Sequence, residues 1–112
     1  MQIVRAFEAQ EVENIHGVSA RPLHSNAHVQ ASMITLLPGE ALKLHLTPVD
    51  VFFYILEGRG IVEIGEERQE VSADMLIDSP ARVPHRLENA GDEVFRFLVV
   101  KTPRPSKPTQ VL

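Results

Sequence analysis

Cysteine is absent from this 112-residue sequence, and basic side chains are fewer than acidic ones. Without cysteine, the chain has no disulfide bond, no thiolate metal ligand and no thiol nucleophile. The formal net charge of -4 argues against a nucleic-acid partner, because proteins that bind the phosphate backbone usually present a basic patch or stripe. Thiol catalysis is therefore excluded, and nucleic-acid binding is not expected.

Long hydrophobic runs are missing as well. No run of eighteen apolar residues occurs, and residues 1–15 mix charged and apolar side chains instead of forming the apolar segment of a signal peptide. We therefore expect a cytoplasmic protein without membrane contact. No segment of ten or more residues has the amphipathic period of a helix, so an all-helical fold is not expected.

Short strand-like segments separated by turn residues make up most of the chain. Hydrophobic residues account for 44% and charged residues for 23% of the sequence, which is usual for a globular domain. Eight to ten short strands at regular spacing indicate an all-β fold, either a double-sheet jelly roll or a barrel. The predicted strands cover residues 2–7, 29–37, 41–47, 51–56, 61–64, 67–71, 75–77, 85–88 and 93–101, with a loop at 17–22.

The C-terminal segment has a different composition from the rest. Three prolines fall between residues 103 and 108, and proline cannot donate a hydrogen bond to a neighbouring strand. We therefore predict one domain over residues 1–102 and a proline-rich tail over residues 103–112, which is mobile or lies against the outside of the domain.

The segment 39–58 places a lone histidine in an apolar, strand-like run. The spacing of Gly39, His45, Thr47, Val51 and Gly58 resembles the first motif of the cupin superfamily, G-x5-H-x-H-x3/4-E-x6-G. Thr47 stands at the place of the second histidine, and Val51 stands at the place of the glutamate. The chain thus resembles a small single-domain cupin with a degraded metal-binding motif.

A second segment has the same resemblance. The family's second motif, G-x5-P-x-G-x2-H-x3-N, corresponds to Asp74, Pro80, Arg82, His85 and Asn89, and other residues occupy both glycine places. The two motifs together cover residues 39–89. The resemblance implies a double-stranded β-helix, the jelly-roll barrel of the cupins.

The resemblance also implies a divalent transition metal such as iron, manganese, zinc or nickel, held by imidazoles and a carboxylate. Only His45 and His85 stand at ligand places. Asp50 is the first candidate for a third ligand, but alternation along a strand points its side chain outward unless a bulge follows Pro48. Gln30 and the histidines of residues 24–28 are further candidates.

Strand alternation predicts which side chains face the lumen. Phe52, Tyr54 and Leu56 point away from it. A mostly apolar lumen with a few polar groups is typical of a small-molecule site. The alternative is that the two histidines are only buried side chains, hydrogen-bonded to each other, to water or to Thr47. The residues predicted to line a ligand pocket are His45, Thr47, Val51, Phe53, Ile55 and His85.

These observations leave three classes of function. The first is a barrel that binds a small molecule and has partly lost its metal site. The second is a metal-dependent enzyme of the cupin type, such as a dioxygenase, isomerase or decarboxylase, that uses His45, His85 and a third donor. The third is a structural domain with a filled barrel. We also predict a homodimer, formed through the outward row of residues 52–56 or through an edge of segment 93–101.

Overall fold

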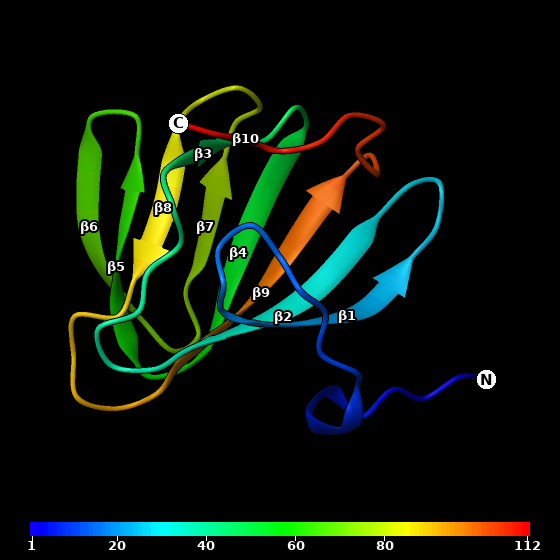
Figure 1. Ribbon diagram of the computed structural model, residues 1–112, viewed down its shortest axis with the longest axis horizontal. Helices are drawn as coiled ribbons and strands as arrows, with labels where there is room; N and C mark the ends of the chain where they lie inside the picture. Colours follow the sequence, from blue (N-terminus) through cyan, green and yellow to red (C-terminus); the bar gives the residue numbers. More distant parts are fainter.

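Two five-stranded antiparallel β-sheets face each other in the computed structural model, which describes residues 1–112 (Figure 1). The strand order is β1-β2-β9-β4-β7 in the first sheet and β10-β3-β8-β5-β6 in the second. Consecutive strands such as β4 and β5 lie in opposite sheets, so the chain winds around the barrel as a jelly roll. The predicted all-β class is confirmed. The strands are β1 (Ser19–Ser25), β2 (Gln30–Leu36), β3 (His45–Leu46), β4 (Asp50–Glu57), β5 (Arg59–Ile64), β6 (Glu67–Ser72), β7 (Leu76–Ser79), β8 (His85–Glu88), β9 (Phe95–Thr102) and β10 (Gln110–Val111).

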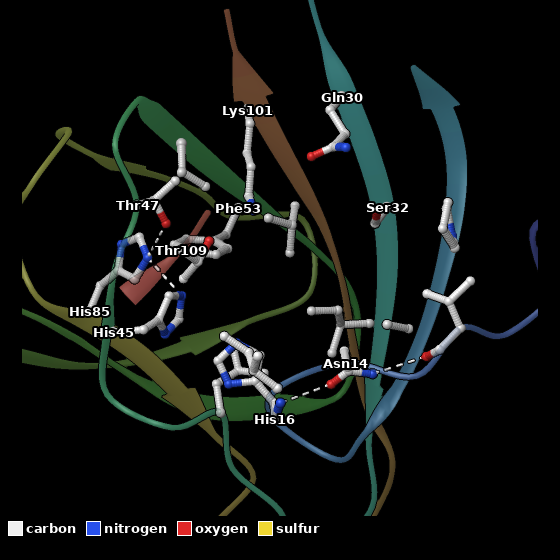
Figure 2. A pocket seen from close by; sticks show the side chains of 18 of the residues that line it. Asn14, His16, Gln30, Ser32, His45, Thr47, Phe53, His85, Lys101 and Thr109 are labelled. Atoms are coloured by element: carbon white, nitrogen blue, oxygen red, sulfur yellow. Dashed lines mark hydrogen bonds between the residues drawn. The ribbon is translucent and has the colours of Figure 1, made fainter. Parts of the chain in front are cut away.

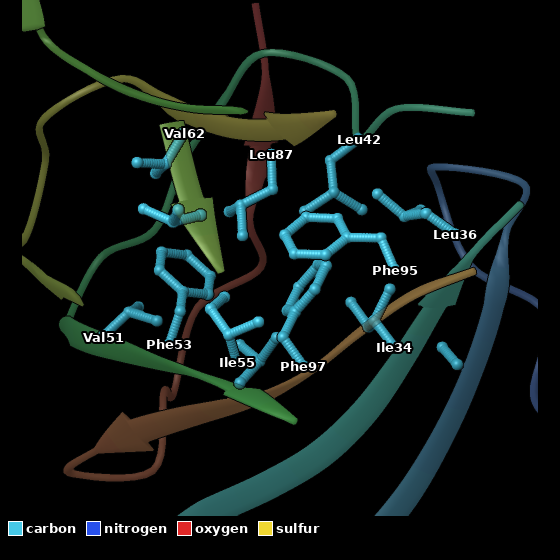
Figure 3. Packing of buried hydrophobic residues seen from close by; sticks show 13 residues of the cluster. Ile34, Leu36, Leu42, Val51, Phe53, Ile55, Val62, Leu87, Phe95 and Phe97 are labelled. Atoms are coloured by element: carbon cyan, nitrogen blue, oxygen red, sulfur yellow. The ribbon is translucent and has the colours of Figure 1, made fainter. Parts of the chain in front are cut away.

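Aromatic and branched side chains fill one end of the space between the sheets (Figure 3). Phe95, Phe97 and Val99 of β9 are buried, as strand alternation predicts. Phe95 lies opposite Leu36 of β2, and Phe97 lies opposite Ile55 of β4. Burial of each phenylalanine contributes about 1.5–3 kcal/mol to stability, so these rings hold the two sheets together.

The N-terminal third differs from the prediction. Residues 2–7 form no strand, and a short 3-10 helix, η1 (Ala6–Glu8), lies there instead. Residues 17–22, predicted as a loop, contain the start of β1. The strand was not predicted because Pro22 is unfavourable within a sheet. This proline is tolerated here because β1 is an edge strand with a register shift between Pro22 and His24. No helix of the chain is long and apolar enough to cross a membrane.

Two other predicted strands also change. Segment 41–47 is reduced to the two residues of β3 and an isolated bridge between Ala41 and Glu88. The strand predicted at 75–77 is β7 (Leu76–Ser79); Met75 and Leu76 are exposed, and the buried residue of β7 is Ser79. The reason is that β7 lies at the edge of its sheet, where little covers an apolar side chain.

The C-terminal segment joins the second sheet. Gln110 and Val111 form β10, which pairs with β3, and the Leu112 amide donates a hydrogen bond to the Leu44 carbonyl at 2.9 Å. The prolines exclude a central strand, as predicted, but not this edge strand. The end of the chain is therefore part of the barrel rather than a loose tail.

The outer face of the first sheet carries the predicted outward row. Phe52 and Tyr54 are half-buried and Leu56 is exposed, so their orientation agrees with the prediction. Strand β9 lies between β2 and β4, however, and both of its edges are paired. Segment 93–101 therefore offers no free edge to a second copy, and that route to a dimer was wrong.

Candidate ligand pocket

A cavity of about 290 Å³ lies between the sheets, at the end that the aromatic core does not fill (Figure 2). Residues 12–16 cover one side of it, and Thr109 of the C-terminal segment contributes to its wall. The surface of the wall is mainly apolar, with polar side chains at a few places. The barrel is thus not completely filled, and its open space is at the lower end of the range for small-molecule sites.

His45 and His85 lie side by side at the cavity wall, with their ring planes at 70° to each other. They are directly opposite each other in the pairing of β3 with β8, and they are only 6% and 1% exposed. Their Nε2 atoms are 3.0 Å apart, and their ring centroids are 4.4 Å apart. The sequence predicted this meeting of two histidines that are forty positions apart.

The hydrogen bonds of the two rings define where their protons lie. His45 Nδ1 is 2.6 Å from the Lys43 carbonyl oxygen, which can only accept, so His45 carries its proton on Nδ1. His45 Nε2 must then accept, and His85 Nε2 donates to it. His85 Nδ1 therefore accepts from the Ser79 hydroxyl at 2.6 Å. Thr47 Oγ1 lies 3.2 Å from His85 Nε2 and is a second acceptor for that proton.

Burial keeps this pair neutral. Desolvation by burial, together with electrostatic repulsion from neighbouring groups such as Lys101, lowers the pKa of His85 to about 3. Desolvation also lowers the pKa of His45, and the hydrogen bond to the Lys43 carbonyl opposes this shift only in part. Both imidazoles are therefore uncharged at neutral pH, and the proton pattern of a neutral pair applies.

His16 is a third imidazole at this wall, and the sequence analysis did not find it. Its ring lies edge-on to that of His45, with centroids 4.6 Å apart, and its Nδ1 accepts a hydrogen bond from the Lys43 amide at 2.9 Å. Asn14 supports the turn by accepting from the His16 amide and donating to the Val18 carbonyl. Burial lowers the pKa of His16 to about 4. No local periodicity marks this residue, because a loop brings it to the pocket.

Lys101 also lines the cavity and was missed (Figure 2). It is the next inward position of β9 after Phe95, Phe97 and Val99, so the same alternation could have found it. It lies opposite Gln30 on β2 and Val51 on β4. Desolvation lowers the pKa of its amine, and none of the six salt bridges of the chain includes it.

The other predicted site residues separate into two groups. Thr47, Val51 and Phe53 line the cavity, whereas Ile55 faces inward but packs within the core. Asp50 does not reach the cavity: it is exposed, and its carboxylate accepts a hydrogen bond from the Ala81 amide at 2.8 Å. The side chain of Asp50 therefore points outward, as strand alternation predicts, and no bulge turns it toward the cavity.

The remaining candidates for a third metal ligand also differ in position. Gln30 and His24 line the cavity, and His28 is exposed outside it.

The side chains around His45 and His85 do not supply the set of ligands that a resident transition metal ion needs. Such sites use about three protein ligands, and no group of three or more His, Cys, Asp or Glu side chains is arranged to hold a metal ion. His16 already uses Nδ1 to accept from an amide, so its other nitrogen carries a proton and offers no lone pair. Asp50, the nearest carboxylate in the motif, lies outside.

The backbone of the second motif keeps the left-handed conformation at both of its glycine places. Asp74 and Arg82, which occupy its two glycine places, are the only residues other than glycine with positive φ, at 75° and 63°. A left-handed conformation is costly for such residues, so the surrounding fold imposes it. Asn89 is 1% exposed and donates to the carbonyls of Leu36 and Glu93. Its role is to tie β2 to the loop before β9.

Comparison with known families agrees with these motifs. The family described as Cupin domain matches residues 32–101, which include every strand from β3 to β8. The chain belongs to the cupin family. This cupin is 34% identical over 73 residues to the polyketide synthase CurC of Streptomyces cyaneus, a match that covers 64% of this chain and 47% of that protein. The chain spans about half the length of the curated relatives it matches.

Solved structures share the same fold. TT1209 from Thermus thermophilus has a TM-score of 0.81 and 30% sequence identity, with 94% of this cupin and 100% of that chain covered. The polyketide cyclase RemF from Streptomyces resistomycificus has a TM-score of 0.86 and 20% identity, with 100% of this cupin and 85% of that chain covered. The double-stranded β-helix that the motifs imply is thereby confirmed, and at 20% identity the likeness to RemF concerns the fold alone.

Proposed function

We propose that this cupin binds a small organic molecule in the cavity, with His45 and His85 as polar anchors and without a resident metal ion. The observation that carries the proposal is the direct Nε2 to Nε2 hydrogen bond between the two buried imidazoles. A metal ligated by both rings would need both Nε2 lone pairs. In this pair, one Nε2 carries the proton that the other accepts.

The surroundings of the pair support an organic ligand. The cavity wall is mainly apolar, so it favours the hydrocarbon part of a ligand. All four ring nitrogens of His45 and His85 have protein partners, so a polar group of the ligand takes the place of the Nε2 to Nε2 hydrogen bond and is held by these two atoms and the Thr47 hydroxyl. Among its relatives, a polyketide synthase and a polyketide cyclase are named for the chemistry of organic molecules. Small ketones and phenols of the polyketide type are therefore suitable first probes.

One observation favours the alternative, a metal-dependent enzyme such as a dioxygenase, isomerase or decarboxylase. Two nitrogens bound to one ion at about 2.1 Å and at right angles are about 3.0 Å apart, which is also the separation of the two Nε2 atoms. Each Nδ1 is held by an oxygen, of Lys43 and Ser79 respectively, as is usual for ligating histidines. This alternative requires the His85 proton to move to Nδ1 and a third donor to enter the site.

The test is elemental analysis of protein purified without a histidine tag, followed by calorimetric titration with zinc, manganese, iron(II) and nickel. We expect no stoichiometric metal and no tight binding. A metal content near one per chain that His45→Ala and His85→Ala both abolish would replace the proposal with the alternative.

Binding of organic probes is measured on the same preparation by nuclear magnetic resonance. His45→Ala and His85→Ala should each weaken binding by about two- to tenfold, because one hydrogen bond contributes about 0.5–1.5 kcal/mol net. His28→Ala is the matched control, since His28 is exposed outside the cavity. Equal binding by all three variants would show that the histidines are not anchors.

A further inference from the structure

The cavity contains a cation that no protein group neutralises. Lys101 extends into it from β9, yet the six salt bridges of the chain all join arginines to glutamates elsewhere (Figure 2). No hydrogen bond of the Lys101 side chain to the protein is present either. Lys101 is half-buried, and partial desolvation lowers the pKa of its amine, so an anionic partner in the cavity would stabilise the charged form.

Polar side chains without protein partners line the same cavity as this ammonium. Gln30 lies directly opposite Lys101 in the pairing of β2 with β9, at a position where side chains are close neighbours. Gln30, Ser32 and Thr109 line the same cavity, and none of their side chains makes a hydrogen bond within the protein. One cation and three neutral hydrogen-bonding groups thus converge on the open space from β2, β9 and the C-terminal segment.

We propose that the cavity binds a small organic carboxylate, with Lys101 as the residue that holds its anionic group. This proposal rests on the function proposed above and names the class of its ligand. The carboxylate accepts from the Lys101 ammonium and from the Gln30 amide, and the apolar body lies against Val51 and Phe53.

The charge of the site favours a carboxylate over a phosphate. The imidazoles of His16, His45 and His85 are neutral, and Lys101 is the one lysine or arginine among the residues that line the cavity. A phosphate carries up to two negative charges and is usually held by an arginine, by several cations or by a helix N-terminus. None of these lines this cavity. A single lysine matches the single charge of a carboxylate.

The test compares acids with their neutral amides. Hexanoate is paired with hexanamide, and 4-methylbenzoate with 4-methylbenzamide, and dissociation constants are measured by nuclear magnetic resonance at pH 7. In the unchanged protein, each acid should bind about tenfold or more tightly than its amide, because hydrogen bonds to a charged group are the stronger ones. Lys101→Met should remove this difference between acid and amide, whereas Lys101→Arg should retain it.

Lys107→Met is the matched control, because this exposed lysine lies outside the cavity and its loss changes the net charge equally. Equal affinity for acid and amide in the unchanged protein would overturn the carboxylate assignment while leaving the proposed cavity binding intact. Tighter binding of 4-methylphenyl phosphate than of 4-methylbenzoate would overturn it in favour of phosphate. Failure of every acid and amide to bind would overturn both proposals together.

Discussion

Lowering the pH from 7 to 5 should destabilise this cupin through its buried histidines. The pKa of His85 is about 3 in the folded chain and about 6.5 in the unfolded chain. The unfolded chain therefore binds a proton at pH 5 that the folded chain excludes, and the free energy of unfolding falls as the pH falls. The loss begins near pH 6.5 and is complete only below the folded pKa.

The magnitude follows from the difference in proton binding. At pH 5 the unfolded His85 imidazole lies about 1.5 pH units below its pKa, which corresponds to a loss of about 2 kcal/mol relative to neutral pH. His45 and His16, whose pKa values are also lowered by burial, add to the loss in the same direction. Such a change is a large part of the stability of an ordinary domain, which is about 5–15 kcal/mol.

Urea titrations at pH 7, 6 and 5 measure this effect directly. With a slope of about 1–2 kcal/mol per molar urea, the midpoint should decrease by about 1–2 M. His85→Gln should weaken the pH dependence, and His28→Gln, at an exposed position, should keep it. Carboxylates remain largely ionised in this range, so they contribute little. A free energy of unfolding that stays constant from pH 7 to pH 5 would mean that the histidines are not buried in neutral form.

Four further predictions concern the fold and its surfaces. Asn89→Ala should lower the free energy of unfolding by about 2–4 kcal/mol in urea titrations, because the buried carbonyl of Leu36 and the partly buried carbonyl of Glu93 lose their donor; a loss below about 0.5 kcal/mol would show that water replaces the amide. Deletion of residues 103–112 should lower the melting temperature by more than about 8 °C, since β10 covers β3, and an unchanged temperature would assign the segment to a dispensable tail. The double variant Thr47→His, Val51→Glu should gain zinc binding in calorimetry because both positions face inward. A folded double variant that binds no zinc would show that the motif is misplaced on the strands. Sedimentation at tens of micromolar should reveal a homodimer formed through the outward apolar row of β4, and a 12.5 kDa species alone would exclude it.

Alternation along strands made much of the site predictable. A period of two places His45 and Thr47 on one face of a strand and Val51 and Phe53 on one face of the next, and all four are buried. The turn residues bounded β8 correctly at both ends, because proline precedes it and asparagine follows it. These features are encoded within a few neighbouring residues.

The missed features depend on contacts between distant parts of the chain. His16 reaches the pocket through a loop held by Asn14, and no local pattern specifies where that loop packs. Strand β10 exists because β3 leaves an unpaired edge, which the proline-rich composition around it cannot show. Lys101 is different, since extending the alternation of β9 by one more position would have placed it in the cavity.

Nitrogen chemical shifts of the histidine rings are the most direct measurement of the state of this site. In protein purified from metal-replete medium, His45 should be protonated on Nδ1 and His85 on Nε2, with both rings neutral at pH 7. Binding of an organic ligand should shift the Nε2 resonances of both rings. Two rings that both lack a proton on Nε2, or whose signals are broadened or shifted by a bound metal ion, would contradict the metal-free hydrogen-bonded pair on which the proposed function rests.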